Sequence, residues 1–546
     1  MIDPIALLCE ALGPLGGVPQ IQLRRTPDAW SDATVFSHAP SRVARLLAEL
    51  PGDAAIVHEV LQLPKMVEIR FTDEFVAVAG DELRRSAGEC LRPAAASLPR
   101  AVVSFCDPNA TKALHIGHLR NLAVGDALAT LLFQGGADVI RQSVVCDVGR
   151  AVAEAVAGYM SYHSAGDPRA LGMRPDAFVG ECYAAYQARG STDSSDEPDP
   201  DARLSASARC AETDAAAHIL RALRDNEPRM TEIWSRLLGW VLEGHQRTFD
   251  RLGIAFNHYI FERDSLHRLT AVARRAISAG VFEQNPDGSV DMIGRAPFEG
   301  RVPMIRSDGL ETGYMRHFAI WYDMQQECTA PTQCINVTGA EWYTTGRIRE
   351  ASLSALGPCP LYDNYHRLTV GMVHSDGGVM KSRDGKAPLI EDHLDVVSDR
   401  LRNLQWTNFH DTDEHAGVIL KCSVLAPPVS KPMIFTFERL CDARVHPGWN
   451  ILRAYLESER SAAEGPAGVS TPRDPGYRYA VLRAYELAVI RQVAIDSYEP
   501  TLVLKFMSAL AKWYLAAPRS SSVASVVRST LSIAGTSIGL FKDRTA

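Results

Sequence analysis

Residues 100–145 read RAVVSFCDPNATKALHIGHLRNLAVGDALATLLFQGGADVIRQSVV. The run at 100–106 is apolar and contains β-branched residues, which predicts a buried strand. From Ile116 the apolar residues recur at a helical period that ends at Gly135 and Gly136, and a second strand is predicted at 137–145. The stretch therefore predicts a strand–helix–strand unit of an α/β fold.

Two histidines, His115 and His118, stand at the N-terminus of the predicted helix. Free backbone N–H groups and the helix dipole favour anions at that place. Imidazoles there can donate hydrogen bonds to a phosphate as it becomes pentacoordinate, which stabilises the transition state electrostatically. A second signal, Met380-Lys381-Ser382-Arg383, follows far downstream. Each signal is weak alone, but their order and separation predict two halves of a site that binds ATP and activates a carboxylic acid.

The segment 107–120, DPNATKALHIGHLR, resembles the signature loop of class I aminoacyl-tRNA synthetases, in particular of the arginyl type. In that type a Pro-Asn pair and a lysine three residues before the first histidine accompany the motif, as Pro108, Asn109 and Lys112 do here. The resemblance implies a Rossmann-type catalytic domain with a parallel sheet. Further segments resemble the same family in the family's order: 146–150, 305–309, 337–341, 371–373 and 380–395.

The chain has 546 residues, which is enough for about three domains. Residues 1–95 match in position the extra N-terminal α+β domain of arginyl-type enzymes. The catalytic domain is expected at 96–400, with a largely helical insertion at about 155–255 whose segment 191–207, rich in Ser, Asp and Pro, predicts a mobile acidic loop. Residues 401–546 are expected to form an all-α domain like the family's anticodon-binding domain. Helical spacing is found in it at 450–460, 479–493, 501–515 and 523–540.

Composition excludes several classes of protein. Hydrophobic residues make up 46% of the chain and charged residues 22%, which is ordinary for a soluble globular protein. No uncharged apolar run reaches about 18 residues, so no membrane span is predicted. The N-terminal stretch carries Asp3 and Glu10 and lacks a basic start, so it does not resemble a secretory signal. The 11 cysteines include no CxxC pair, which favours reduced thiols in the cytoplasm over disulfides or a zinc site.

The charge is distributed unevenly along the chain. The net charge of −8 argues against a nucleic-acid partner, yet residues 421–546 contain 16 Lys and Arg against 10 Asp and Glu. A basic C-terminal part on an acidic protein is what binding to a phosphate backbone needs. A solvated helical surface with an excess of arginine is the alternative interpretation. The family resemblance implies tRNA as the partner of this region, and a monomeric protein.

The resemblance also implies roles in an ATP site. His115 and His118 would stabilise the α-phosphate in the transition state, and Lys112 would be a second phosphate ligand, because arginyl-type enzymes often lack a full Lys-Met-Ser-Lys-Ser motif. Lys381 would be the cation of the late loop, and Mg²⁺ would accompany ATP. Nucleotidylyltransferases share the HxGH pattern, but the helical C-terminal third and the late Met-Lys-Ser argue against them. The other implied ATP ligands are Gly117 in the motif, Gly339 and Glu341 beside the ribose, and Met372 and Val373 at the adenine edge.

The implied amino-acid pocket departs from the family's pattern. Arginyl-type enzymes hold the guanidinium between carboxylates, because a planar cation that leaves water needs paired anions. The acid expected on the first strand is Ser104 here, and the acid expected after an arginine is His317. Two missing anions would leave a buried guanidinium unpaired, at a cost on the order of 3–5 kcal/mol. Tyr314 takes the place of a family tyrosine in one of two registers, and Asn109 is expected near the α-amino and carboxylate groups of the amino acid.

The region expected to contact tRNA is also altered. The run at 446–454, HPGWNILRA, stands where the family has a tyrosine-rich segment that reads the anticodon. Trp449 could stack on a base, and Arg453 is a candidate tRNA contact. At the position where the family has a polar side chain that reads the anticodon, this chain has Leu452. This replacement argues against recognition of an arginine anticodon.

The sequence thus predicts an arginyl-type class I aminoacyl-tRNA synthetase, which joins an amino acid to AMP and passes the acyl group to the 3′ end of a tRNA. Two alternatives are enzymes: a paralogue that uses a non-arginine amino acid, for example in a biosynthetic pathway, and an arginine enzyme with a rearranged pocket. A third alternative is a catalytically silent tRNA-binding or regulatory protein. The presence of all four candidate catalytic residues argues against a catalytically silent protein. Sequence drift in such a protein would not be expected to retain Lys112, His115, His118 and Lys381 together.

Overall fold

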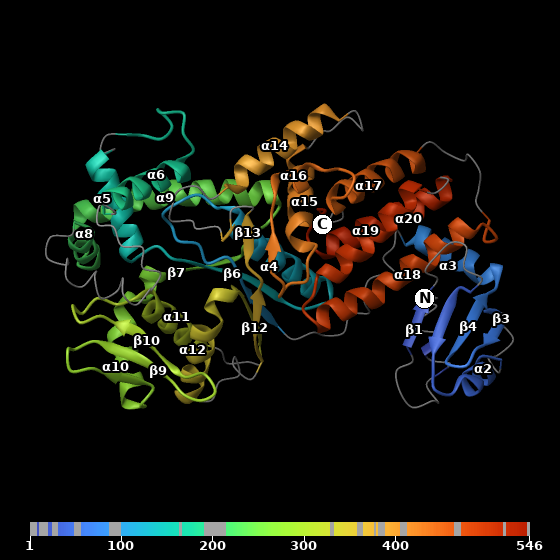
Figure 1. Ribbon diagram of the computed structural model, residues 1–546, viewed down its shortest axis with the longest axis horizontal. Helices are drawn as coiled ribbons and strands as arrows, with labels where there is room; N and C mark the ends of the chain where they lie inside the picture. Colours follow the sequence, from blue (N-terminus) through green and yellow to red (C-terminus); the bar gives the residue numbers. More distant parts are fainter. Residues whose placement is uncertain are drawn as a thin grey trace.

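The computed structural model describes residues 8–9, 12, 20–23, 31–48, 56–86, 100–162, 166–190, 215–327, 332–357, 364–375, 378–379, 388–404, 412–463, 471–516 and 520–542. A small N-terminal sheet, a central parallel sheet with helices around it and a C-terminal group of helices follow one another along the chain (Figure 1). The acidic segment predicted at 191–207 and the late-loop residue Lys381 lie outside the described residues.

A five-stranded parallel sheet forms the centre of the expected catalytic part, in the order β12-β11-β5-β6-β7. The strand order reverses between β5 and β11. In open α/β sheets, ligands bind outside the carboxyl ends of the strands at such a reversal. The α/β class predicted from the sequence is confirmed. The strands are β5 (Ala101–Ser104), β6 (Val139–Val145), β7 (His258–Phe261), β11 (Gln333–Gly339) and β12 (Tyr365–Val370).

The predicted strand–helix–strand unit consists of β5, α4 (Ile116–Gln134) and β6. β5 is shorter than predicted because Cys106 adopts a left-handed backbone with φ of 59°. The helix ends as the sequence predicts, with Gly135 as C-cap and Gly136 at a φ of 96°. Gly125 lets the helix cross the strand closely, because a Cβ there would lie 2.2 Å from Cγ of Phe105.

Between β6 and β7 the chain forms a group of helices, in the region where an insertion at about 155–255 is expected. Its described helices are α5 (Arg150–Tyr162), α6 (Pro175–Gly190), α8 (Ala215–Arg224) and α9 (Pro228–Leu252). They enclose an apolar core of their own, in which Phe178 packs edge-on against Trp240 and Tyr159 with ring centroids 5.7 and 6.3 Å apart. This core holds the four helices together as one unit, which lies at one end of the central sheet (Figure 1).

After β7 a second small unit precedes β11. It contains a three-stranded antiparallel sheet in the order β10-β9-β8. Helix α11 (Gly313–Glu327) leads from this sheet back to the central one and carries Tyr314 and His317. The other elements of this unit are η3 (Glu262–Arg268), α10 (Leu269–Ser278), β8 (Phe282–Gln284), β9 (Val290–Gly294) and β10 (Gly300–Ile305). After β11 come η4 (Ala340–Trp342) and α12 (Tyr343–Ala355), and α12 packs against β9.

The C-terminal part is helical, as the sequence predicts, and the four predicted helices correspond to α17 to α20. A small sheet, β14-β13-β15, joins it to the catalytic part through β13 (Val373–Ser375), β14 (Gly378–Val379) and β15 (Met433–Ile434). The helices are α14 (Ile390–Asn403), α15 (Thr412–Leu425), α16 (Phe437–Cys441), α17 (Pro447–Ala463), α18 (Pro475–Asp496), α19 (Thr501–Ala516) and α20 (Ser521–Ser537). Among the described residues, no helix combines the length and the apolar character needed to cross a membrane.

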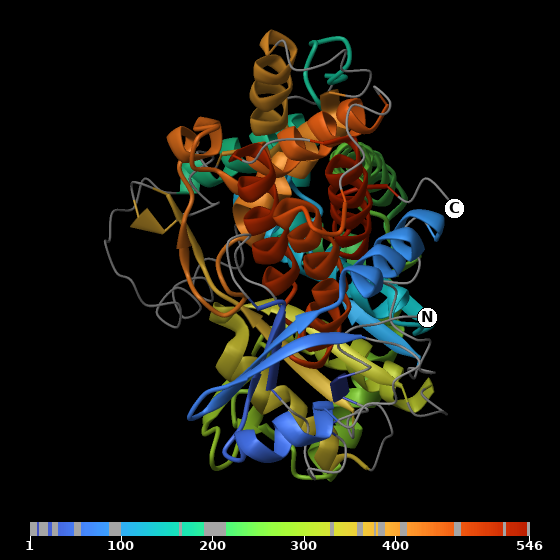
Figure 2. The same ribbon diagram turned by 90° about the vertical axis from the view of Figure 1, so that its right-hand side faces the viewer.

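The N-terminal part is α+β and packs against the C-terminal helices (Figure 2). Its antiparallel sheet has the order β1-β2-β4-β3. Helix α3 contacts α18 and α20, and the hydroxyl of Tyr485 donates to the carbonyl of Ala79 at 3.2 Å. The described elements are β1 (Gln20–Leu23), β2 (Ala33–Phe36), α2 (Pro40–Ala48), β3 (Val57–Gln62), β4 (Met66–Phe71) and α3 (Asp73–Arg85).

A buried ion pair fastens this N-terminal part to α18. Nε of Arg478 donates to Oδ1 of Asp32 at 2.8 Å, and its Nη1 donates to Oδ1 of Asp73 at 3.0 Å. Asp32 is fully buried, and its Oδ2 also accepts from the backbone N–H of Phe71 at 2.9 Å. Arg478, Lys421 and Arg491 are all buried. Part of the basic excess at 421–546 therefore lies inside the protein rather than on a surface that a polyanion could reach.

We expect Arg478→Met to lower the free energy of unfolding by about 3–5 kcal/mol, because the change leaves the carboxylate of Asp32 buried without its partner. The matched control is Arg402→Met, which removes an exposed partner of Asp399 and should cost less than about 1 kcal/mol. Urea unfolding followed by circular dichroism measures both values. Equal midpoints for the two variants would show that the buried pair does not stabilise the junction.

Candidate active site

The two predicted histidines cap helix α4 by binding its first backbone N–H groups. Nδ1 of His115 accepts from the N–H of Gly117 at 3.1 Å, and Nδ1 of His118 accepts from the N–H of His115 at 3.2 Å. The ring centroids are 3.9 Å apart. Gly117 leaves room for this arrangement, because a Cβ there would lie 2.8 Å from Cε1 of His115. Since Nδ1 accepts in both rings, each neutral imidazole carries its proton on Nε2.

Both imidazoles are neutral near pH 7. Burial, followed by the positive charge of Lys112, lowers the pKa of His115 to about 4. Burial also lowers the pKa of His118, with His115 and Lys112 as further causes. A neutral Nε2–H donates one hydrogen bond and carries no net charge. The two imidazoles can therefore donate to a charged phosphate without the cost of removing water from a charged imidazolium.

Lys112 is held at this site by the helical insertion. Its carbonyl lies 2.9 Å from Nε2 of His245 on α9, and its Cβ would lie 3.3 Å from a Cβ added at Gly180 on α6. Burial lowers the pKa of His245 to about 4. The insertion thus positions the lysine that the resemblance singled out, although 133 residues separate His245 from it.

The chain returns to the histidine motif immediately after the segment that carries Lys381. The N–H of Ile116 donates to the carbonyl of Pro388 at 3.0 Å, and the N–H of Ile390 donates to the carbonyl of Leu114 at 3.1 Å. His115 and Leu389 form an isolated antiparallel bridge. Residues 388–390 are therefore fixed against the motif.

Arg120 joins α4 to the strand expected at the adenine edge. Its Nη1 donates to the carbonyl of Gly371 at 3.0 Å, and its Nη2 donates to the carbonyl of Pro428 at 2.9 Å. The carbonyl of Met372 accepts from the N–H of Met433 at 2.9 Å, and the side chain of Val373 is buried in β13. The carbonyl of Met372 is therefore occupied by a strand contact, although these two residues do lie beside α4.

Gly339 and Glu341 lie together at the carboxyl end of β11. A Cβ at Gly339 would lie 2.3 Å from the Glu341 carboxylate, so a side chain at 339 would displace it. Asn121 of α4 joins this strand end to β5: its Nδ2 donates to the carbonyl of Val337 at 2.9 Å, and its Oδ1 accepts from the N–H of Cys106 at 2.6 Å. Sequence reasoning missed Asn121, whose polar side chain on an otherwise apolar helix face was the available signal.

Ser104 belongs to a chain of hydrogen-bonded polar groups on the sheet. It is fully buried, and its Oγ accepts from Nε2 of Gln142 at 3.2 Å. Oε1 of Gln142 lies 3.2 Å from Nδ1 of His258, and its Nε2 lies 3.6 Å from Sδ of Met324 on α11. The position at which the family pattern has an acid is thus occupied by a hydrogen-bonded hydroxyl.

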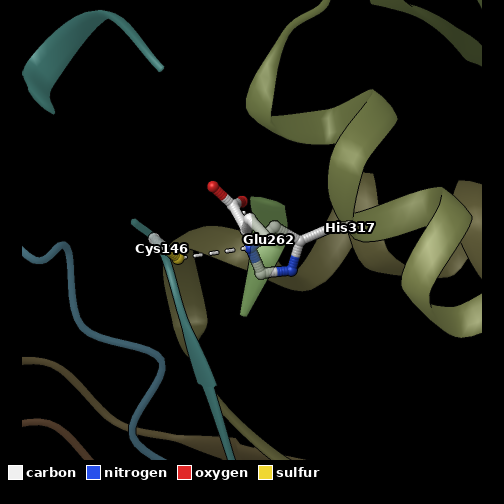
Figure 3. Close-up of side chains that lie close together, drawn as sticks. All are labelled: Cys146, Glu262 and His317. Atoms are coloured by element: carbon white, nitrogen blue, oxygen red, sulfur yellow. Dashed lines mark hydrogen bonds and ion pairs between the residues drawn. The ribbon is translucent and has the colours of Figure 1, made fainter. Parts of the chain in front are cut away.

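His317 lies beside two side chains that the sequence analysis did not single out (Figure 3). Its Nε2 is 3.5 Å from Sγ of Cys146 and 3.4 Å from Oε1 of Glu262. Oε2 of Glu262 accepts from Nε of Arg316 at 3.0 Å. Cys146 follows β6 and Glu262 follows β7, so each stands at the carboxyl end of a strand of the parallel sheet. That shared position was the only sequence signal, because no short spacing connects the three residues.

Glu262 is fully buried, whereas Cys146 and His317 are partly buried. Burial raises the pKa of Glu262 to about 7, while Arg316 opposes that shift. Burial lowers the pKa of His317 to about 3, and Arg349 and then Arg316 add to the shift. Burial also raises the pKa of the Cys146 thiol. A ligand's charge in such a place must be matched by an opposite charge or by hydrogen bonds.

The other two residues expected to bind the amino acid border this cluster. Asn109 is exposed and forms a parallel bridge with Cys146. Tyr314 packs edge-on against Trp342 with ring centroids 5.8 Å apart. His317 and Tyr314 share α11, while Ser104 reaches the same helix through Gln142 and Met324. The residues predicted to bind the amino acid therefore lie around one region at the carboxyl edge of the sheet.

The prediction that Trp449 stacks on a base is wrong for this structure. Trp449 is fully buried, and its Nε1 donates to the carbonyl of Leu440 at 2.8 Å. Leu452 is buried in the same core, so α17 uses this segment for packing. Arg453 is exposed, and its Nε donates to Oε1 of Glu457 at 2.7 Å. The helical period of the run already indicated a buried face, which outweighs the capacity of an indole to stack.

The depressed pKa of His245 makes stability depend on pH. The unfolded chain takes up a proton near pH 6.5 and the folded protein only near pH 4, so protonation favours the unfolded state between these values. Stability should therefore be constant above about pH 6.5 and fall as the pH drops towards 4, by up to roughly 1 kcal/mol per pH unit for each such histidine. His245→Gln, which keeps a donor for the Lys112 carbonyl, should make this slope shallower. His267→Gln, at an exposed site, is the control in urea unfolding at several pH values, and equal slopes for both variants would contradict the assignment.

Comparisons with known proteins agree with this arrangement. The family model described as tRNA synthetases class I (R), catalytic domain, matches residues 86–271. An arginine--tRNA ligase of Treponema pallidum is 28% identical over 296 residues, which cover 54% of this chain and 47% of that protein. An arginine--tRNA ligase of Phocaeicola vulgatus is 23% identical over 453 residues, which cover 76% of this chain and 73% of that protein.

Solved structures share the fold. The arginyl-tRNA synthetase of Thermus thermophilus matches with a TM-score of 0.70 and 19% identity over 99% of both chains. That of Plasmodium falciparum matches with a TM-score of 0.64 and 11% identity, over 99% of this chain and 97% of the other. The chain spans about half the length of the two Treponema relatives, 47% and 48%. Taken with the histidine motif at the sheet reversal, these matches show that the chain is similar in sequence to arginine--tRNA ligases and shares the fold of arginyl-tRNA synthetases.

Proposed function

We propose that the protein activates an amino acid with ATP, forming an aminoacyl-adenylate and pyrophosphate, and passes the acyl group to the 3′ end of a tRNA. The observation that carries this proposal is the pair of neutral imidazoles at the N-terminus of α4, at the point where the strand order reverses. Relatives named as arginine--tRNA ligases support the same reaction class.

In this proposal the protein acts on the α-phosphate of ATP through fixed hydrogen-bond donors. His115 and His118 donate from Nε2 to the oxygens whose negative charge grows as the amino-acid carboxylate attacks. Lys112 adds a positive charge beside them, and Lys381 would add a second from the late loop. Mg²⁺ arrives with ATP as part of the substrate and reduces the charge on the departing pyrophosphate. Gly339, Glu341, Met372 and Val373 remain candidates for holding the nucleoside.

A tRNA is the partner that we propose for the helical part. The exposed guanidinium of Arg453 on α17 is compatible with a phosphate contact. Because Trp449 and Leu452 are buried, reading of the anticodon would have to use other side chains. We propose that the protein works in the cytoplasm as a monomer.

We further propose that arginine is a poor substrate, so that the protein is a specialised paralogue. Ser104 and His317 replace the two acids of the family pattern. The carboxylate beside His317 already has a partner, because Glu262 accepts from Arg316 at 3.0 Å. Asp107, whose carbonyl faces Cys146, uses its carboxylate to accept from the N–H of Val144 at 3.0 Å. A bound guanidinium would therefore add an unmatched positive charge to a buried place, which is strongly unfavourable.

We expect His115→Ala and His118→Ala each to slow amino-acid-dependent ATP–pyrophosphate exchange by about 10²–10³-fold, because each removes one preorganised donor from a developing charge. The assay uses a panel of amino acids, with and without total tRNA. His267→Ala, at an exposed position on η3, is the matched control and should keep the original rate. Exchange at the original rate in either motif variant would overturn the assignment of the ATP site.

For arginine, kcat/KM should be low in the unchanged protein. Ser104→Glu and His317→Asp together should raise it, and by more than the product of the two single effects, because the guanidinium gains a coupled pair of anions. The measurement compares kcat/KM for arginine in the four proteins at equal tRNA. Ser143→Glu, one strand away and also buried, controls for an unspecific effect of negative charge. Efficient use of arginine by the unchanged protein would identify an ordinary arginine enzyme instead.

A further inference from the structure

The Cys146–Glu262–His317 cluster has the dimensions of a metal site. Its three donor atoms, Sγ, Oε1 and Nε2, lie within 4.8 Å of one another and come from three different elements. Tetrahedral Zn²⁺ has bonds of about 2.3 Å to sulfur and about 2.0–2.1 Å to nitrogen and oxygen, which places sulfur and nitrogen about 3.5 Å apart and nitrogen and oxygen about 3.3 Å apart. The observed separations are 3.5 Å and 3.4 Å. These two separations suit an ion, and the third pair, Sγ and Oε1, lies within 4.8 Å.

The donor set favours zinc among the common metals. A thiolate, an imidazole and a carboxylate together suit a borderline-soft ion, whereas Mg²⁺ and Ca²⁺ prefer oxygen ligands. Three protein ligands leave the fourth tetrahedral position open, as in sites where zinc binds a substrate or a water molecule. This cluster would therefore present an ion that can still take one ligand from the pocket.

The surrounding contacts hold the three ligands in place. Glu262 uses different oxygens for its two contacts, so Oε2 can keep its bond to Arg316 while Oε1 faces the cluster. Nη2 of Arg316 donates in turn to the carbonyl of Val148 at 3.3 Å. Cys146 is fixed by its backbone, because its carbonyl accepts from the N–H of Ala110 at 3.0 Å. Outer contacts of this kind orient metal ligands and raise affinity.

The cluster also lies at the place where the side chain of an amino-acid substrate is expected. Cys146 pairs with Asn109 of the motif loop, and His317 replaces a carboxylate that would read arginine. A guanidinium stays protonated in proteins and offers no lone pair, so it cannot bind a metal. A neutral imidazole can bind through its unprotonated ring nitrogen, and a thiol or an ammonium group can bind once its proton has passed to water. A metal here would thus exclude arginine and select for a donor atom.

We propose that Cys146, Glu262 and His317 bind one Zn²⁺, and that its open position binds the side chain of the amino acid that the protein activates. The substrate class is an amino acid whose side chain carries a thiol, an imidazole or an amine. The second half of this inference rests on the proposed adenylation, whereas binding of the ion does not.

The first experiment measures the metal directly on the full chain. Protein produced with added Zn²⁺ should contain about one ion per chain by elemental analysis, and the Co²⁺-substituted protein should show a thiolate-to-cobalt absorption band, as expected for one tetrahedral site with a cysteine ligand. Cys146→Ser and His317→Ala should weaken zinc binding by more than the roughly 10–100-fold that loss of an outer contact costs. Cys182→Ser, which removes a buried cysteine of the insertion, should retain the ion and the band.

Circular dichroism and gel filtration establish that the variants fold. Glu262→Gln provides a second test, since it keeps the size of the side chain and should still weaken zinc binding. A chain that folds and contains no zinc, or a Cys146→Ser variant that binds zinc as tightly as the unchanged protein, would overturn the site.

The second experiment asks whether the ion reads the substrate. Cysteine, histidine and ornithine represent the three donors, and arginine is the comparison. The amino acid that supports ATP–pyrophosphate exchange should shift the cobalt band, and arginine should not. Full exchange activity with that amino acid in metal-free protein would overturn the role of the ion in selection while leaving the proposed adenylation intact. Bound zinc whose band shifts with an amino acid, in a chain that forms no adenylate, would support the site and contradict the proposed function.

Discussion

The guanidinium of Arg120 is the interaction on which the arrangement of the other parts depends. It is buried on α4, two residues after His118, and donates to the carbonyls of Gly371, Pro428 and Val429. A buried cation with three backbone acceptors has few alternative positions, because losing any of them would leave a charge without compensation. The same side chain thus fixes the histidine helix, the end of the central sheet and the start of the helical part. Asn121, the next residue, performs the equivalent task between β5 and β11.

Local pattern was sufficient to predict the elements around this point. The apolar period from Ile116, the two glycines at 135–136 and the β-branched run before Asp107 each reflect a backbone preference that acts over a few residues. For that reason the boundaries of α4 and the strand–helix–strand sequence around it agree with the sequence prediction. The end of β5 was predicted too late, because the left-handed φ of Cys106 is imposed by a contact from Asn121 rather than by the residue itself.

Contacts between distant segments could not be predicted in the same way. Glu262 is 54 residues before Arg316 in the chain, and nothing in either neighbourhood indicates that the two form a buried ion pair. The burial of Trp449 was mistaken for exposure because an indole suits both a core and a stacking surface. In each case the missing information was which faces of two elements meet, and this depends on the whole fold rather than on a window of sequence.

The changes in the amino-acid pocket are linked by charge. Replacing two acids by Ser104 and His317 removes negative charge from a place that also contains Arg316 and borders Arg349. Glu262 balances Arg316, but the neighbourhood then has little charge left to offer a cationic side chain. A neutral imidazole beside a cysteine is of no use for binding a guanidinium, yet the two provide a nitrogen and a sulfur donor at a spacing that suits a metal ion. In the site that we propose, His317 both removes a carboxylate that arginine would need and supplies one of the three metal ligands, so a single replacement would account for the loss of one specificity and the gain of another.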